Sequence, residues 1–232
     1  MELSRRLKAV ADAVTKGNVV ADVGCDHAYI SIYLIQEGYA PSVIAMDVNK
    51  GPLQRAMDNI KLHGYEHNIQ TRLSNGLQKL EVKEADTILL AGMGGNLMTQ
   101  ILEEGHMAVK EAKELILQPQ SEISDLRKYL HTIGYEILSE EMVIDDDKYY
   151  IVIKSKNVGQ AIPYEKEIYY LFGKNLLEEK DAVLKQYLLK ELNIREEVMI
   201  HLVASASERA KERMEEMKQE INYLKEGLEY WL

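Results

Sequence analysis

The sequence contains a single cysteine, Cys25, among its 232 residues, so no disulfide bond can form within the chain. Such sparing use of cysteine is typical of proteins that stay in a reducing compartment. No run of apolar residues approaches the roughly 18 that a membrane-spanning helix needs. The first residues also lack the apolar stretch of a secretory signal. We therefore expect a cytoplasmic protein without membrane association.

The chain also lacks an excess of positive charge, because 28 lysines and arginines face 38 acids and the net charge is −10. A nonspecific nucleic-acid-binding protein usually carries a basic surface, so that class is disfavoured. A specific nucleic-acid partner stays open, because basic side chains can gather on one face. The length allows one large domain, or a domain with an appendage.

Short apolar segments alternate with stretches of helical spacing over residues 1–157. The apolar segments predict strands at residues 19–23, 43–46, 69–73, 87–91 and 114–117. Residues 135–143 and 149–154 then predict a hairpin around an acidic turn. Strands that alternate with helices form mostly parallel sheets covered on both faces. We therefore predict an α/β fold, a doubly wound Rossmann-like sheet with an antiparallel pair at one edge.

The composition changes after residue 157, and from Tyr164 onward no segment has the pattern of a strand. Apolar side chains instead recur at alternating steps of three and four, which is typical of a coiled coil or a long helical hairpin. They are Val203, Ala206, Ala210, Met214, Met217, Ile221, Leu224, Leu228 and Trp231. We predict an all-helical, coiled-coil-like domain over residues 158–232, with residues 178–192 as the antiparallel partner. Its apolar face could also form a dimer, although a monomer is favoured.

The first predicted strand ends in the turn Asp22-Val23-Gly24-Cys25-Asp26-His27-Ala28-Tyr29. Where a dinucleotide-binding fold has glycines at three fixed offsets, this turn has Gly24, Asp26 and Ala28. The Asp26 carboxylate would repel a diphosphate, but it would tolerate the sulfonium and ammonium groups of S-adenosylmethionine. The turn therefore favours a methyltransferase over a dehydrogenase.

Polar or glycine-rich residues follow the other predicted strands as well. Asp47 ends the second strand, where a carboxylate can accept hydrogen bonds from ribose hydroxyls. Residues 74–77, 92–95 and 118–119 follow the next three strands. Parallel strands end at the same edge of a sheet, so these residues predict a ligand-binding crevice.

Each strand end has a predicted role in this crevice. Gly24 would admit the methionine part of the cofactor, while Asp22 would hold the turn or reach the ammonium group. Asn75 and Gly76 would lie near the adenine. The predicted cofactor-binding residues are Asp22, Gly24, Cys25, His27, Asp47, Val48, Asn75, Gly76 and Gly92.

Several of these residues also have purely structural interpretations. Asp47 could cap the helix that follows, Asn75-Gly76 is a common turn dipeptide, and Gly94-Gly95 could relieve crowding at a strand–helix junction. His27 fits a hydrogen-bonded structural histidine. Cys25 lacks the histidine and aspartate partners of a nucleophile, which favours a small packed thiol. No cluster has metal-ligand spacing, so we expect no metal.

The chain resembles the bacterial tRNA (adenine-N1)-methyltransferases that modify adenosine 22. The resemblance runs in order through residues 3–7, 22–29, 47–52, 91–95, 117–119 and 148–150, and the helical appendage fits as well. The strings Asp26-His27-Ala28-Tyr29 and Gly92-Met93-Gly94-Gly95 are the most specific. The family pattern has threonine in place of Cys25 and favours aspartate in place of Asn75.

The resemblance implies methyl transfer from S-adenosylmethionine to N1 of an adenine in tRNA. It implies that Asp26 stabilises the positive charge on the methylated base or holds the adenine amine, and that Tyr29 stacks on the base. The expected catalytic residues are Asp26, Tyr29, Met93 and Gly94. Arg5, Arg6 and Lys8 are expected to reach tRNA beside the mouth of the crevice. The alternatives are a nicotinamide-dependent oxidoreductase and a noncatalytic RNA-binding scaffold.

Overall fold

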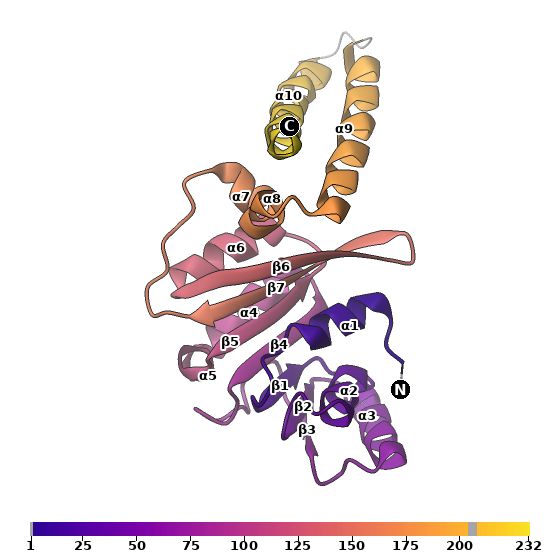
Figure 1. Ribbon diagram of the computed structural model, residues 1–232, viewed down its shortest axis with the longest axis vertical. Coiled ribbons are helices and arrows are strands. Elements are labelled where there is room, and N and C mark those ends of the chain that lie inside the picture. Colours follow the sequence, from indigo (N-terminus) through magenta and orange to yellow (C-terminus); the bar gives the residue numbers. More distant parts are fainter. Residues whose placement is uncertain (1, 204–207) are drawn as a thin grey trace. The chain divides into compact units, whose positions relative to one another are not determined.

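Seven strands form one sheet in the order β3-β2-β1-β4-β5-β7-β6 (Figure 1). The computed structural model describes residues 2–203 and 208–232. Strands β1 to β5 run parallel, while β7 pairs antiparallel with both β5 and β6. The strands are β1 (Val20–Val23), β2 (Val43–Asp47), β3 (Ile69–Leu73), β4 (Thr87–Met93), β5 (Glu114–Pro119), β6 (Tyr135–Asp145) and β7 (Lys148–Asn157). The prediction of a doubly wound sheet with an antiparallel edge is confirmed.

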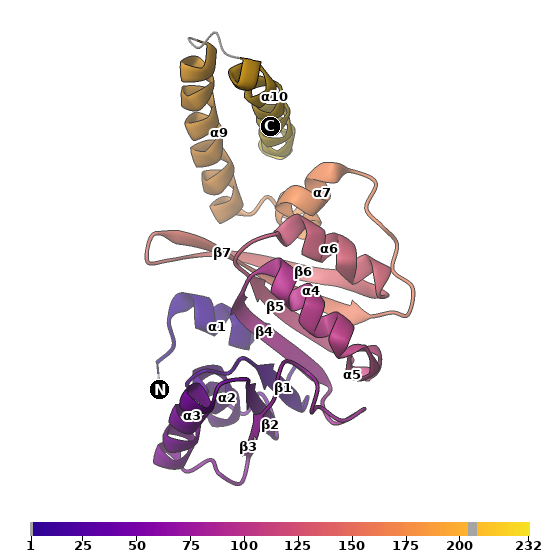
Figure 2. The same ribbon diagram turned by 180° about the vertical axis from the view of Figure 1, so that it is seen from behind.

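Helices cover both faces of this sheet (Figures 1 and 2). On one face lie α1 (Arg5–Asp12), α2 (Tyr29–Gln36) and α3 (Lys50–His63). On the other lie α4 (Gly95–Glu104), α5 (His106–Glu111) and α6 (Ile123–Thr132). The first three helices bury a continuous apolar core in which Val10, Ile32 and Ala56 pack with strand residues such as Ala45 and Leu89. Burial of this apolar surface holds the strand ends in place for the site.

The hairpin of β6 and β7 turns at Asp146 and Asp147, whose φ angles are +48° and +59°. Two successive residues with positive φ form the tight turn whose twist matches that of paired strands, and aspartate tolerates this conformation. Both strands extend further than the sequence predicted, because pairing continues from Tyr135–Asn157 to Asp145–Lys148.

The chain divides into two compact units, Met1–Pro163 and Tyr164–Leu232. The first unit extends beyond residue 157 because the Val158 N–H donates to the Gly134 carbonyl oxygen at 3.0 Å, and Gly134 packs against the backbone of Gly159. In residues 2–203 and 208–232, no helix is both long and apolar enough to cross a membrane.

The second unit is helical. It contains α7 (Glu167–Phe172), α8 (Lys174–Glu178), α9 (Ala182–Val203), α10 (Glu208–Leu228) and a 3-10 turn, η1 (Glu229–Trp231). Helices α9 and α10 form a hairpin in which Met217, Ile221 and Leu224 of the predicted apolar series are buried (Figure 1). Ala206 and the side chains of Val203 and Ala210 lie outside the described residues.

Candidate active site

A cavity of about 550 Å³ opens at the carboxyl ends of β1, β2, β3 and β4. The strand order reverses between β1 and β4, and ligands of doubly wound sheets bind at such a reversal. Nearly all of the predicted site residues line this cavity. They are Asp22, Gly24, Cys25, Asp26, His27, Tyr29, Asp47, Val48, Asn75, Gly76, Gly92 and Met93.

The turn after β1 is held in a strained conformation beside the cavity. The N–H groups of Gly24 and Cys25 both donate to the carbonyl oxygen of Met46, at 2.8 and 2.9 Å, which ties the turn to β2. Gly24, Asp26 and Ala28 all have positive φ, at +76°, +46° and +58°. This conformation costs an alanine or aspartate roughly 1–3 kcal/mol, and such strain concentrates at functional sites. Glycine adopts the φ of +76° at position 24 without strain, and a side chain there would also displace the end of the Met93 side chain.

Asp47 is buried at the end of β2. One carboxylate oxygen accepts from the Asn49 N–H at 2.8 Å, and the other accepts from the Asp26 N–H at 3.3 Å. Asn49 is the N-cap of helix α3, so the first of these bonds ties Asp47 to the residue just before the helix. The Asp47 oxygens keep lone pairs for further donors such as ribose hydroxyls.

Asp22 is buried in β1, just before the turn that contains Gly24, and accepts a hydrogen bond from the Ser31 hydroxyl at 2.6 Å. Burial raises the pKa of Asp22 to about 6. Hydrogen bonds from Ser31 oppose this shift, while the negative charge of Asp47 adds to it. The carboxylate is therefore ionised at neutral pH and could pair with a cation in the cavity.

This pKa predicts how binding of S-adenosylmethionine depends on pH. A cationic ligand favours the ionised form of Asp22, so affinity is full above the pKa of about 6 and falls as pH drops through it. We expect a loss of about tenfold for each pH unit below the pKa. Calorimetric titrations between about pH 5 and pH 7 measure this slope. Asp22→Asn should flatten the profile, and an equally steep profile in that variant would assign the titration to another group.

Cys25 is a buried thiol. Burial, together with the negative charges of Asp22 and Asp47, raises the pKa of Cys25 well above its ordinary value. A thiol that stays protonated at neutral pH is a poor nucleophile. These surroundings favour the packed-thiol interpretation over a catalytic one.

An aromatic and acidic rim, formed by Asp26, His27 and Tyr29, lies on one side of the cavity. The rings of His27 and Tyr29 stack in parallel, with centroids 5.2 Å apart and an interplanar angle of 9°. The Asp26 side chain is 64% exposed, and one of its oxygens lies 3.7 Å from both His27 Nε2 and Arg55 Nη2. The carboxylate therefore faces solvent at the mouth, where a substrate would approach.

The third strand end has a closed turn. The Ser74 hydroxyl donates to the Gly76 carbonyl oxygen at 2.9 Å and accepts from the Lys79 N–H at 3.2 Å. The turn presents Asn75, an exposed side chain, to the cavity. Asn75 and Gly76 therefore form an ordinary turn and also line the cavity.

Gly94 is the predicted site residue that the structure leaves outside the cavity. It is the N-cap of α4, and a side chain there would press on the Ser121 hydroxyl. A side chain at Gly95 would overlap the backbone of Ser121 and Glu122. These contacts favour the crowding interpretation for this pair of glycines.

The cavity also contains residues that sequence reasoning did not place there. Leu97 lies in the first turn of α4, and Gln120 lies just beyond β5. Arg6, expected to contact RNA, is part of the cavity wall. These residues are far apart in the sequence and share no motif, so only the folded chain reveals their proximity.

The sheet order and the acid at the end of β2 place the chain among the doubly wound, Rossmann-like nucleotide-binding folds. Residues 3–153 match a family model described as a methyltransferase domain. The tRNA (adenine(22)-N(1))-methyltransferase of Bacillus subtilis (strain 168) is 30% identical over 234 residues, which cover 99% of this chain and 98% of that protein. The chain belongs to this family of tRNA (adenine(22)-N(1))-methyltransferases, as its motifs predicted.

Solved structures agree with this assignment over nearly the whole chain. Streptococcus pneumoniae Sp1610, solved in complex with S-adenosyl-L-methionine, is 34% identical with a TM-score of 0.87, covering 98% of this chain and 100% of its own. M. capricolum TrmK, solved in complex with the cofactor product S-adenosyl-homocysteine, is 26% identical with a TM-score of 0.85. That comparison covers 99% of each chain.

Proposed function

We propose that this protein transfers a methyl group from S-adenosylmethionine to N1 of adenine in tRNA, at adenosine 22. The observation that carries the proposal is the stacked pair of His27 and Tyr29 beside Asp26, at the mouth of a cavity that holds Asp22 and Asp47. The rim suits a base, and the interior suits a cationic nucleoside cofactor. The relatives named above support the choice of substrate and cofactor.

The interior of the cavity fits S-adenosylmethionine. Asp47 supplies a buried carboxylate for the ribose hydroxyls, and Gly24 supplies a turn without a side chain. Asp22 supplies negative charge for the ammonium group, and Asn75 offers an amide for the adenine edge. When bound, the cofactor supplies a methyl group on a positively charged sulfur, which leaves as a neutral thioether.

The target adenine needs positioning rather than deprotonation. Its N1 carries a lone pair in the ring plane, which forms the new N–C bond directly, so no general base is required before attack. The product base is positively charged near neutral pH. We propose that Asp26 stabilises this charge or holds the adenine amine, and that the base stacks on Tyr29. Moving the base out of its stack in tRNA costs a few kcal/mol, which contacts with the rim would offset.

The two alternatives lack support. An oxidoreductase would place a diphosphate beside Asp22, Asp26 and Asp47, three acids that line one cavity. A noncatalytic scaffold leaves unexplained why a strained turn and two buried carboxylates surround that cavity.

We propose that residues 1–163 carry the catalytic site and that residues 164–232 grip tRNA, in a protein that acts as a monomer in the cytoplasm. Lys8 pairs with Asp12, and Arg6 donates to Gln118. Arg5, which is exposed at the start of α1, is therefore the basic residue of this helix best placed to contact RNA.

The proposal is tested by incubating unmodified tRNA transcripts with radiolabelled S-adenosylmethionine and identifying the labelled nucleoside. We expect N1-methyladenosine, and a matched transcript with guanosine at position 22 should remain unlabelled. Labelled N6-methyladenosine would contradict the N1 assignment, and label in the guanosine transcript would contradict the position. A parallel titration with S-adenosylhomocysteine and NAD should show binding of the first alone.

A further inference from the structure

Gly92 lies at a break in the pairing between β4 and β5. The register shifts between Ala91 and Met93, and Gly92 has a φ of +77°. Its N–H donates to a side-chain atom, Oε1 of Gln118, at 3.1 Å. Met93, which lines the cavity, comes directly after this break. A side chain of β5 therefore holds the backbone that leads to Met93, one of the expected catalytic residues. We call this part of the cavity wall, Gly92 and Met93, the acceptor side.

The Gln118 amide is held in one orientation. The residue is fully buried, and its Nε2 donates to the Pro119 carbonyl oxygen at 3.2 Å. Its Oε1 accepts a second hydrogen bond, from Nη1 of Arg6 at 2.8 Å. A bond from a charged donor is stronger than one between neutral groups, so Arg6 is the stronger of the two contacts at Oε1.

Arg6 is itself fixed by the end of the β6–β7 hairpin. The carbon at the centre of its guanidinium lies 5.4 Å from the centroid of the Tyr150 ring, within range of a cation–π contact. Its backbone N–H donates to Oδ2 of Asp145 at 3.2 Å. Arg6 thus connects helix α1 and the hairpin to the cavity wall.

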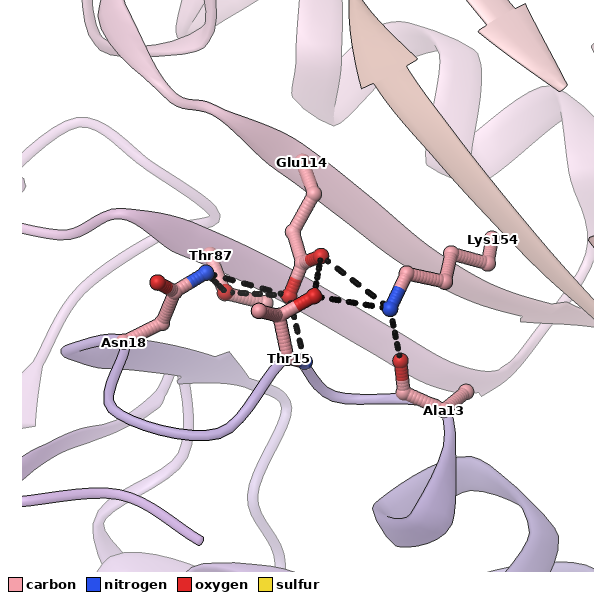
Figure 3. Close-up of polar contacts among 6 residues, drawn as sticks. All are labelled: Ala13, Thr15, Asn18, Thr87, Glu114 and Lys154. Carbon is pink, nitrogen blue, oxygen red and sulfur yellow. Dashed lines mark hydrogen bonds and ion pairs between the residues drawn. The ribbon is translucent and has the colours of Figure 1, made fainter. Parts of the chain in front are cut away.

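A polar network anchors the chain just beyond the other end of α1 (Figure 3). The Thr15 N–H and hydroxyl donate to the Glu114 carboxylate at 2.9 and 2.6 Å, and Lys154 donates to the Ala13 carbonyl oxygen at 2.9 Å. Burial acts to raise the pKa of Glu114, but hydrogen bonds and the charge of Lys154 outweigh it and lower the pKa. Glu114 is therefore ionised at neutral pH, and both ends of α1 are tied to the sheet.

We propose that Arg6 is a positioning residue for methyl transfer, which fixes the Gln118 amide and, through it, the backbone at Gly92. The role rests on the proposed function and extends it to a residue outside the glycine motifs. It differs from the phosphate contact that the charge of Arg6 alone would suggest. The guanidinium keeps the acceptor side of the cavity in shape by holding a buried amide.

The first test measures hydrogen exchange of the Gly92 N–H by NMR in the full-length protein without ligands. Arg6→Met should speed this exchange about tenfold, because the amide that accepts from Gly92 loses the stronger of its two donors and is held less firmly. Lys16→Met is the matched control. Lys16 makes a similar contact with a different tyrosine, because its Nζ lies 4.6 Å from the centroid of the Tyr39 ring. The control should leave Gly92 exchange unchanged. Equal exchange in Arg6→Met and the wild type would overturn the proposal.

The second test separates positioning from RNA binding by kinetics. Arg6→Met should lower kcat about tenfold, with KM for tRNA and its salt dependence little changed, because a small displacement at the reacting centre slows the chemical step. Arg6→Lys should recover part of the loss, since an ammonium can still donate to Gln118. Gln118→Met should lower kcat similarly, and the double variant should lose no more than either single one.

A higher KM for tRNA with a weaker salt dependence and an unchanged kcat would identify Arg6 as a phosphate contact and refute the positioning role. The exchange measurement needs no substrate, so its result tests the link between Arg6 and Gly92 even if the protein does not methylate tRNA. Failure of the wild-type protein to methylate tRNA would refute the proposed function alone.

Discussion

Replacement of Asp47 with alanine is expected to weaken binding of S-adenosylmethionine by about 100- to 1,000-fold. A hydrogen bond to a charged group is worth about 1.5–3 kcal/mol, and each 1.4 kcal/mol is about tenfold in affinity. The substitution would remove the hydrogen bonds from the ribose hydroxyls of the cofactor. It would also leave the N–H groups of Asn49 and Asp26 without the carboxylate to which they now donate. Isothermal titration calorimetry measures the loss directly.

Two further variants make the Asp47 experiment specific. Asp47→Asn retains the shape and one acceptor oxygen but loses the charge, so its affinity should fall between those of the wild type and the alanine variant. Asp58→Ala removes an exposed carboxylate of α3, which accepts from Gln54, and should bind normally. Asp47 is buried, so thermal melting must show that each variant is folded at the titration temperature. Normal affinity in a folded Asp47→Ala protein would remove the carboxylate from the cofactor site.

Replacement of Asp26 with asparagine should lower kcat about 100-fold while affinity for S-adenosylmethionine changes little. Preorganised groups that stabilise developing charge contribute about this much to the rate. Asparagine tolerates the positive φ of +46° at this position, so the turn should keep its shape. Single-turnover methylation of tRNA measures the effect. Asp26→Ala should be at least as slow, and near-normal turnover in both variants would exclude a catalytic role.

The ion pair of Asp26 with Arg55 needs a control of its own. Arg55→Met breaks the pair, whose nearest atoms are 3.7 Å apart, but leaves the carboxylate in place. If the carboxylate stabilises the methylated base, this variant should not reproduce the loss seen with Asp26→Asn. An equal loss in Arg55→Met would show that the pair matters for the shape of the rim rather than for the chemistry.

The parts of the site that could be predicted from sequence are those encoded by short segments. Asp22 lies near the end of the apolar strand β1 and Asp47 ends the apolar strand β2, and parallel strands end at one edge of a sheet. Gly24 and Asp26 share one turn, so their departure from a phosphate-binding pattern was visible at once. Gly94 shows the limit of this reasoning, because its motif could not reveal that Ser121 and Glu122 pack against the helix start.

Long-range contacts explain what the sequence could not supply. Arg6 and Gln118 are 112 residues apart, and only the packing of helix α1 against β5 brings them together. The domain boundary is another case, since residues after 157 belong to the first unit through contacts with Gly134. Neither contact has a local pattern that periodicity or turn chemistry could detect.

By itself, the sequence determined the alternation of strands and helices, the helical second unit, and the turn of Gly24 and Asp26. These features depend on apolar periodicity and turn chemistry, which act over a few neighbouring residues. The tertiary structure alone decided the environment of each group. It buried Asp22 so that its pKa rises to about 6, exposed Asp26 at the mouth of the cavity, and placed Arg6 against Gln118. Burial and electrostatics depend on every neighbour in space, so they exist only once the chain has folded.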